Sequence, residues 1–140
     1  MLTTKARYAV TAMADIAVLE QERGNKPVKL SEIAERQDIP LNYLEQIFAK
    51  LKSSGLVSSI KGPGGGYVIA NGANHTKVLD IVDAVEESIE MTNCGKEHKA
   101  CSPDFARCAT HDLWDGLTKN IRGYLGSVKI SDLAKKKWFI

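Results

Sequence analysis

A glycine-rich segment near the middle of the chain most restricts what this sequence can fold into. Four glycines and one proline stand among the six residues of Lys61–Gly66. Such a segment is unsuited to the interior of a helix or a strand, because glycine loses much conformational freedom there and proline cannot donate a backbone hydrogen bond. Short runs of alternating apolar and polar residues flank it, at 56–60 and 67–70. The pattern predicts a β-hairpin whose tip can approach another molecule closely.

Apolar residues recur at helical spacing before this hairpin and predict three helices. The second and third of these helices are separated only by the tight turn Asp38-Ile39-Pro40. The order of helix, short helix, turn, helix and glycine-rich hairpin is typical of a winged helix-turn-helix. We therefore expect a mainly α protein with a small β-hairpin. The three helices are expected at 3–20, 32–37 and 41–53.

Small polar residues mark the expected helix starts, because their side chains can accept a backbone hydrogen bond there. Proline also suits the first position of a helix, and glycine suits the position just after its end. We expect caps at Thr3 or Thr4, Ser31, Thr76 and Ser131, a helix start at Pro40 and a helix end at Gly55.

The second half of the chain predicts a linking helix at 77–87 and a longer helix that starts between Pro103 and His111 and runs to about Leu125. The longer helix has an apolar stripe, which in so small a protein favours packing on a second copy of the chain. The stripe consists of Leu113, Trp114, Leu117, Ile121 and Leu125. The expected division is a winged helix-turn-helix domain at 1–72, a linking helix at 73–90, a ligand-binding loop at 91–111, and a dimerisation helix with its tail at 103–140.

Polar side chains at the start of the third helix predict contacts with double-stranded DNA. In a helix-turn-helix this helix enters the major groove, where Asn and Gln can pair with adenine and Glu can accept from the cytosine amino group. A cation at the hairpin tip would reach the minor groove or phosphate, and the start of the first helix would bind backbone phosphate. The candidates are Asn42, Tyr43, Glu45 and Gln46 on the third helix, Lys61, Gly62, Pro63 and Gly64 at the hairpin, and Thr3, Lys5 and Tyr8 on the first helix.

The net charge is only +2, from 19 basic and 17 acidic residues. A chain with so little excess charge does not hold a polyanion by charge alone. Shape and a few placed contacts must therefore supply much of the affinity for DNA, and a dimer would double them.

Three cysteines, Cys94, Cys101 and Cys108, lie within one polar stretch, and His111 follows three residues after the last. An odd number of cysteines argues against a disulfide framework, and close Cys pairs typical of zinc sites are missing. The wide spacing favours thiolates around an iron–sulfur cluster, with His111 as the fourth ligand. His98 is a competing ligand, and zinc binding, thiol oxidation or simple burial of the cysteines are alternatives.

Together these segments resemble the Rrf-type winged helix-turn-helix transcription factors, in the branch that senses iron–sulfur clusters, over residues 2–133. The resemblance is carried by Arg7–Val10, Tyr43–Phe48, Gly55–Ser59, Gly62–Tyr67 and the three-cysteine stretch. It implies a homodimer with one [2Fe-2S] cluster per subunit, operator binding that changes with cluster occupancy, and control of cluster-assembly genes. It also implies that Cys94, Cys101, Cys108 and His111 are the cluster ligands, that Asn42, Tyr43, Glu45 and Gln46 read DNA, and that Lys61 is the wing residue.

Two departures from the family pattern matter. The cysteine gaps are six and six residues, where the family more often has five and five, so a [4Fe-4S] centre is an alternative. Position 61 is Lys where Arg is usual, which predicts weaker wing contacts because Lys is more strongly hydrated.

The same cysteines also fit other functions. The alternatives are a regulator that senses nitric oxide, iron or thiol oxidation, and a small iron–sulfur carrier. No nucleophile–base pair or phosphate loop predicts an enzyme, so we expect none and no small-molecule substrate. We also expect no signal peptide, no membrane span and a cytoplasmic protein.

Overall fold

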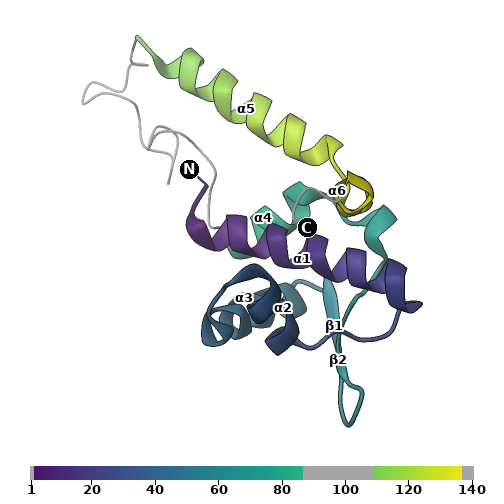
Figure 1. Ribbon diagram of the computed structural model, residues 1–140. Coiled ribbons are helices and arrows are strands. Elements are labelled where there is room, and N and C mark those ends of the chain that lie inside the picture. The colour runs from purple at the N-terminus through teal and green to yellow at the C-terminus, as the bar shows by residue number, and fades with distance from the viewer. Residues whose placement is uncertain (1, 87–108, 137–140) are drawn as a thin grey trace.

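The computed structural model (Figure 1) describes residues 2–86 and 109–136. Six α-helices and one two-stranded antiparallel sheet make up this part of the chain, which confirms the expected fold class. Cys94, Cys101 and Cys108 lie outside the described residues. The elements are α1 Thr4–Arg23, α2 Leu30–Gln37, α3 Leu41–Ser53, β1 Val57–Ile60, β2 Gly66–Ile69, the short 3₁₀ helix η1 Ala73–His75, α4 Val78–Val85, α5 His111–Ser127 and α6 Ile130–Lys136.

Helix α1 runs through the middle of the molecule (Figure 1) and packs against α2 and α3 as well as α4 and α6. It begins after Thr3, whose hydroxyl accepts a hydrogen bond from the Ala6 N–H, and it ends at Gly24 in the left-handed conformation. Residues from Ala12 to Glu20 are buried without a break, so α1 is covered on all sides along this stretch. Helices α2, α3, α4 and α6 all pack around it.

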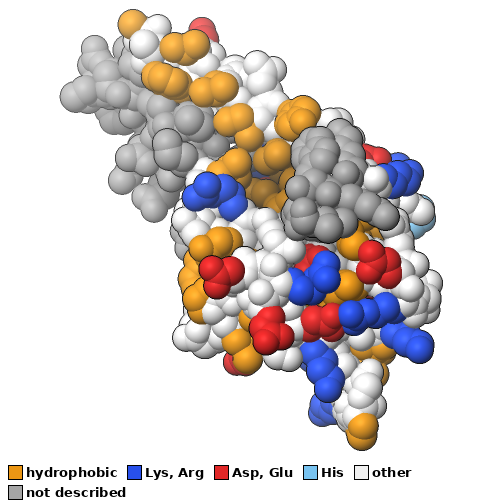
Figure 2. Space-filling model, in the orientation of Figure 1, with side chains coloured by type: hydrophobic (Ala, Val, Ile, Leu, Met, Phe, Trp, Pro, Cys, Tyr) orange, Lys and Arg blue, Asp and Glu red, His pale blue; other side chains and the backbone are white. Residues whose placement is uncertain are grey.

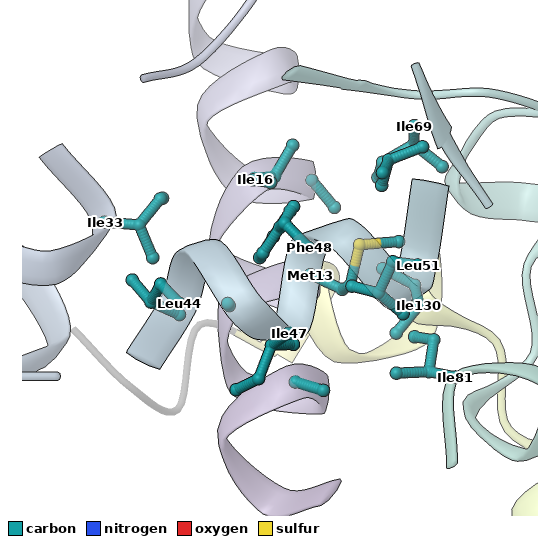
Figure 3. Close-up of a cluster of buried hydrophobic side chains, with 14 of the residues drawn as sticks. Met13, Ile16, Ile33, Leu44, Ile47, Phe48, Leu51, Ile69, Ile81 and Ile130 are labelled. Carbon is teal, nitrogen blue, oxygen red and sulfur yellow. The ribbon is translucent and has the colours of Figure 1, made fainter. Parts of the chain in front are cut away.

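The core lies between α1 and α3, where Ile16 lies beside Phe48 and Met13 beside Leu51 (Figure 3). All four side chains are fully buried. The Phe48 ring also meets the Tyr67 ring of β2 edge-on, with centroids 5.1 Å apart. This contact fixes α3 relative to the hairpin.

The hairpin pairs Val57 with Ile69 at its base and Ile60 with Gly66 toward its tip. Val28, in the extended segment before α2, adds an antiparallel bridge to Tyr67, with N···O distances of 3.0 and 2.8 Å. The hairpin is thus joined to the segment that leads into α2. It projects away from the helices (Figure 1).

On the other side of α1, α5 packs chiefly on α4 and lies apart from α2, α3 and the hairpin (Figure 1). Arg122 of α5 donates two hydrogen bonds to the Asp83 carboxylate of α4, at 3.0 and 3.2 Å. The backbone joins the start of α4 to the segment between α5 and α6: Val78 N–H donates to the Val128 oxygen, and Ile130 N–H donates to the Thr76 oxygen, both at 2.9 Å.

Several predicted helix starts are wrong by one or two residues. Ser31 lies inside α2 and Ser131 inside α6, while Thr76 is buried and donates its hydroxyl to the Gly72 oxygen. Pro40 is the N-cap of α3 and not its first residue. For α4 and α6 the reason is an aspartate in the first turn, which accepts the backbone N–H of a lysine three residues earlier and supplies half of a capping box. The pairs are Lys77 with Asp80 at 3.1 Å and Lys129 with Asp132 at 3.0 Å.

Candidate nucleic-acid interface

One face of α3 is polar and exposed. Asn42, Glu45 and Gln46 all lie on it. The opposite face buries Leu44, Ile47, Phe48 and Leu51 in the core, so the polar residues point outward because the apolar ones are held inward. The helical spacing of the sequence therefore located this face correctly.

The turn before α3 is held by Asp38 and Ile39. Asp38 adopts a left-handed backbone conformation, with φ of 53°. Ile39 is buried, and its N–H donates to the Ala34 oxygen at 3.1 Å. The turn therefore sets the direction in which α3 leaves α2.

An ion pair between α1 and α2, which was not predicted from the sequence, fixes the helix-turn-helix further. Asp15 of α1 is completely buried, and both of its carboxylate oxygens accept hydrogen bonds from the Arg36 guanidinium of α2, at 2.8 and 2.9 Å. The hydrogen bonds from Arg36 to Asp15 raise the pKa of the guanidinium above its ordinary value. The only sequence signal was an aspartate inside an otherwise apolar helix stretch, since the two residues are far apart in the chain.

Tyr8 of α1 meets Tyr43 of α3 edge-on, with ring centroids 5.6 Å apart and an interplanar angle of 88°. Both rings are half-buried. Lys5 precedes Tyr8 by almost one helical turn, so it shares roughly the same side of α1. The structure thus brings the first turns of α1 beside the start of α3, as the predicted set of contacts requires.

The hairpin tip is a tight turn from Gly62 to Gly65, closed by a hydrogen bond from the Gly65 N–H to the Gly62 oxygen at 2.9 Å. Pro63 and Gly64 occupy its two central positions, and Gly64 has φ of 76°, which is typical of a type II turn. Lys61, Gly62, Pro63 and Gly64 are all exposed.

Two further glycines are required by close approach of the backbone. A Cβ on Gly65 would lie 2.1 Å from the Ile60 oxygen, and one on Gly66 would lie 2.4 Å from the Val28 oxygen. Neither position has room for a side chain. The glycine content of this segment therefore serves the shape of the wing itself.

Charges of both signs surround the surface formed by the start of α3 and the hairpin tip. Figure 2 shows Lys and Arg side chains beside the projecting hairpin, with Asp and Glu side chains on the adjoining face. This mixture agrees with the small net charge of the sequence. The face is suited to a few placed contacts and not to general attraction of a polyanion.

Of the four predicted metal ligands, the structure describes only His111. It is the first residue of α5 and is half-buried. Within residues 2–86 and 109–136, no three side chains of His, Cys, Asp or Glu gather as a metal site would need.

The predicted apolar stripe on α5 divides into two parts. Ile121 and Leu125 pack partly against the core of this chain, while Leu113 is 61% exposed. Tyr124, which was not among the residues predicted for the stripe, is 69% exposed. Trp114 and Leu117 are half-buried.

An open apolar groove lies between α1, α4 and α5 and has a volume of about 340 Å³. Leu125, Val82 and Val10 line it, and Figure 2 shows hydrophobic side chains gathered in this region. In the described ranges, no helix is long and apolar enough to cross a membrane.

A recognition helix after a tight turn, followed by a glycine-rich wing, defines a winged helix-turn-helix protein that binds DNA. The family model described as Rrf2, iron-dependent transcriptional regulator, matches residues 2–136. The chain belongs to this family. It is a regulator of transcription and not an enzyme, and it is similar to the members named IscR, as the following relatives show.

The HTH-type transcriptional regulator IscR of Xenorhabdus nematophila is 47% identical over 97% of this chain and 80% of its own length. The solved structure of T. potens IscR superposes with a TM-score of 0.77, at 35% identity, over 97% of this chain and 87% of that one. CymR, named the global cysteine regulator of B. subtilis, gives a TM-score of 0.79 at 29% identity, over 98% of both chains. The fold is thus shared by regulators with different names.

Proposed function

We propose that this protein is a homodimeric transcriptional regulator that holds one [2Fe-2S] cluster per subunit and binds its operator differently with and without it. Genes for iron–sulfur cluster assembly are the proposed targets. The observation that carries the proposal is the place of His111, which begins α5 three residues after the third cysteine of an IscR-like chain.

For DNA, we assign base contacts to Asn42, Glu45 and Gln46, whose side chains are exposed on one face of α3. We assign a further DNA contact to Tyr43 at the same end of the helix. Its ring packs on Tyr8, and this contact holds it in place. The wing residues Lys61, Gly62, Pro63 and Gly64 approach the minor groove or the backbone. Lys5 and Tyr8 approach backbone phosphate from α1, and Thr3 caps the first turn that carries Lys5.

For the cluster, we assign Cys94, Cys101, Cys108 and His111 as ligands. Three thiolates and one imidazole are a donor set suited to iron, and the imidazole nitrogen would be supplied from the first turn of α5. The positive end of that helix favours thiolate over thiol nearby. When bound, an iron–sulfur cluster supplies a redox-active centre that oxidants can destroy.

For the dimer, we assign the face of α5 that includes Leu113, Trp114 and Leu117, continued by Ile121 and Leu125. A leucine that is 61% exposed and a tyrosine that is 69% exposed on one helix, Leu113 and Tyr124, leave apolar surface that a second copy would cover. The proposed division of the chain is 1–72 for DNA binding, 73–90 for the linking helix, 91–111 for the cluster and 103–140 for dimerisation.

The test is purification without oxygen, followed by visible absorbance and measurement of iron and sulfide. We expect coloured protein with equal amounts of iron and sulfide, and loss of both in Cys94→Ala, Cys101→Ala and Cys108→Ala. His111→Ala should retain less cluster than His98→Ala, and the exposed His75→Ala should behave as the wild type. Operator titrations with loaded and stripped protein then test the regulation.

Colourless, iron-poor protein would refute the cluster, and bound zinc or a thiol that oxidises reversibly would support the corresponding alternatives. Equal operator affinity with and without the cluster would refute the proposed regulation while leaving DNA binding intact.

A further inference from the structure

The N-terminus of α1 has only half of a capping box. The Thr3 hydroxyl accepts the Ala6 N–H at 3.3 Å. In a complete box, a Glu or Gln at the position of Ala6 would accept the Thr3 N–H in return. Alanine cannot do so, and the first turn of α1 contains no acidic residue. The exposed Thr3 N–H therefore has no acceptor within the first turn of α1.

Glu86 supplies that acceptor from 83 residues away. Its Oε1 accepts the Thr3 N–H at 2.7 Å and also accepts the Thr3 hydroxyl. Glu86 itself is held at the end of α4, because its N–H donates to the Val82 oxygen at 2.8 Å. A carboxylate also suits this place because the N-terminus of a helix is electropositive.

The other two carboxylates of α4 point to different partners. Asp80 accepts the N–H of Lys77, at the start of its own helix, and Asp83 pairs with Arg122 of α5. Of these three acidic side chains, Glu86 is the one that bonds to α1. Asp83 is therefore a matched control, one turn earlier on the same helix.

The turn that Glu86 completes carries part of the proposed DNA interface. Lys5 lies in this first turn, and Tyr8 follows in the next, where it packs on Tyr43 of the recognition helix. Fraying of the first turn would free the Lys5 backbone from a defined position relative to α3. A cation on a frayed turn loses affinity, because ordering it again costs conformational entropy on binding.

We propose that Glu86 is a positioning residue for DNA binding, which completes the cap of α1 so that Lys5 meets the DNA backbone. It does not touch DNA itself, since phosphate would repel its carboxylate. The proposal rests on the proposed function, in which Lys5 contacts phosphate, and extends it to a residue of α4.

The test measures binding of the full-length protein to a short mixed-sequence DNA duplex over a range of salt concentrations, because phosphate contacts do not depend on sequence. Glu86→Ala should weaken binding about five- to tenfold at 0.1 M salt and make the negative slope of log K against log salt less steep by about 0.9, the value for one lost phosphate contact. Glu86→Gln should bind at least as well as the wild type, because its amide oxygen still accepts both hydrogen bonds. Asp83→Ala should keep the wild-type slope.

A double variant shows whether Glu86 acts through Lys5. We expect Lys5→Ala with Glu86→Ala to bind no more weakly than Lys5→Ala alone. Hydrogen exchange gives a measurement that does not involve DNA: the Ala6 and Arg7 amides should exchange faster in Glu86→Ala and at the wild-type rate in Glu86→Gln.

The outcomes separate this proposal from the proposed function. A wild type that binds no duplex, or a Lys5→Ala variant with the wild-type salt slope, would overturn the assignment of Lys5 and this proposal with it. Normal wild-type binding together with an unchanged slope in Glu86→Ala would overturn the role of Glu86 alone.

Discussion

The buried pair between Asp15 and Arg36 gives the sharpest stability prediction. The Asp15 side chain is completely buried, and Arg36 is the partner of both its oxygens. Arg36→Ala would leave a buried carboxylate without these two hydrogen bonds. Removing one partner of a buried pair costs about 3–5 kcal/mol, because the remaining charge is left uncompensated.

The geometry places the cost at the lower end of that range. The Arg36 side chain is 36% exposed, so water reaches the pair from one side and screens it. We expect a loss of about 3 kcal/mol in the free energy of unfolding. For a chain of this size, each kcal/mol lowers the melting temperature by roughly 3 °C, so Arg36→Ala should melt about 10 °C below the wild type.

The pair Arg23–Glu32 is the matched control, because it joins the same two helix regions at the surface. Its side chains are 43% and 32% exposed, and a pair of this kind contributes about 0–1 kcal/mol. Thermal and urea unfolding at one protein concentration measure both losses. Equal losses in Arg36→Ala and Arg23→Ala would refute the argument from burial.

Three further predictions follow from single contacts. Gly65→Ala should weaken DNA binding in a titration while lowering the melting temperature less than Arg36→Ala does, since its Cβ would meet the Ile60 oxygen at 2.1 Å and distort only the wing; wild-type affinity would contradict this. Burial raises the pKa of Glu20 above its ordinary value of 4.5, against the smaller opposite effect of a hydrogen bond from the Ile69 N–H. The protonated form is then favoured by folding, so the wild type loses stability as pH rises from below 4.5 through the folded pKa, and Glu20→Gln should gain relative to it in urea unfolding over that range; a constant difference would count against burial as the cause. Glu45→Ala should relax sequence preference, because an unpaired carboxylate in the groove is costly; unchanged relative affinities across operator variants would exclude this role.

Local patterns in the sequence predicted most of the fold. The range 41–53 predicted for α3 is confirmed, because four apolar residues at helical spacing face one core. Pro40 precedes the helix instead of starting it, and the C-cap of the helix is Ser54 and not Gly55. The hairpin was predicted from its glycines, and the turn at Gly62–Gly65 shows why they are needed. Periodicity and turn chemistry act over a few residues, so a single sequence displays them.

Contacts between distant residues could not be predicted in this way. Asp15 with Arg36 and Thr3 with Glu86 are separated by 21 and 83 residues, and no local pattern links either pair. The caps predicted at Ser31 and Ser131 are wrong for a related reason. Both are good cap residues, yet α2 begins before Ser31 and α6 before Ser131. For α2 the burial of Leu30 decided the start, and for α6 the bond from the Lys129 N–H to Asp132 did so together with the burial of Ile130.

The arrangement of the helices also limits how a change at α5 could reach the DNA-reading face. Helix α5 packs chiefly on α4, while α4 packs on both α1 and α3. The apolar face of α4 is buried between them, and two of its carboxylates reach in opposite directions, Asp83 to Arg122 of α5 and Glu86 to Thr3 of α1. Because close-packed interiors transmit strain, a shift of α5 that keeps its contacts with α4 would displace α4, and with it the cap of α1. We infer that α4 is one element through which a signal at the start of α5 would act on Lys5 and on the start of α3, beside α6, which follows α5 and also packs on α1.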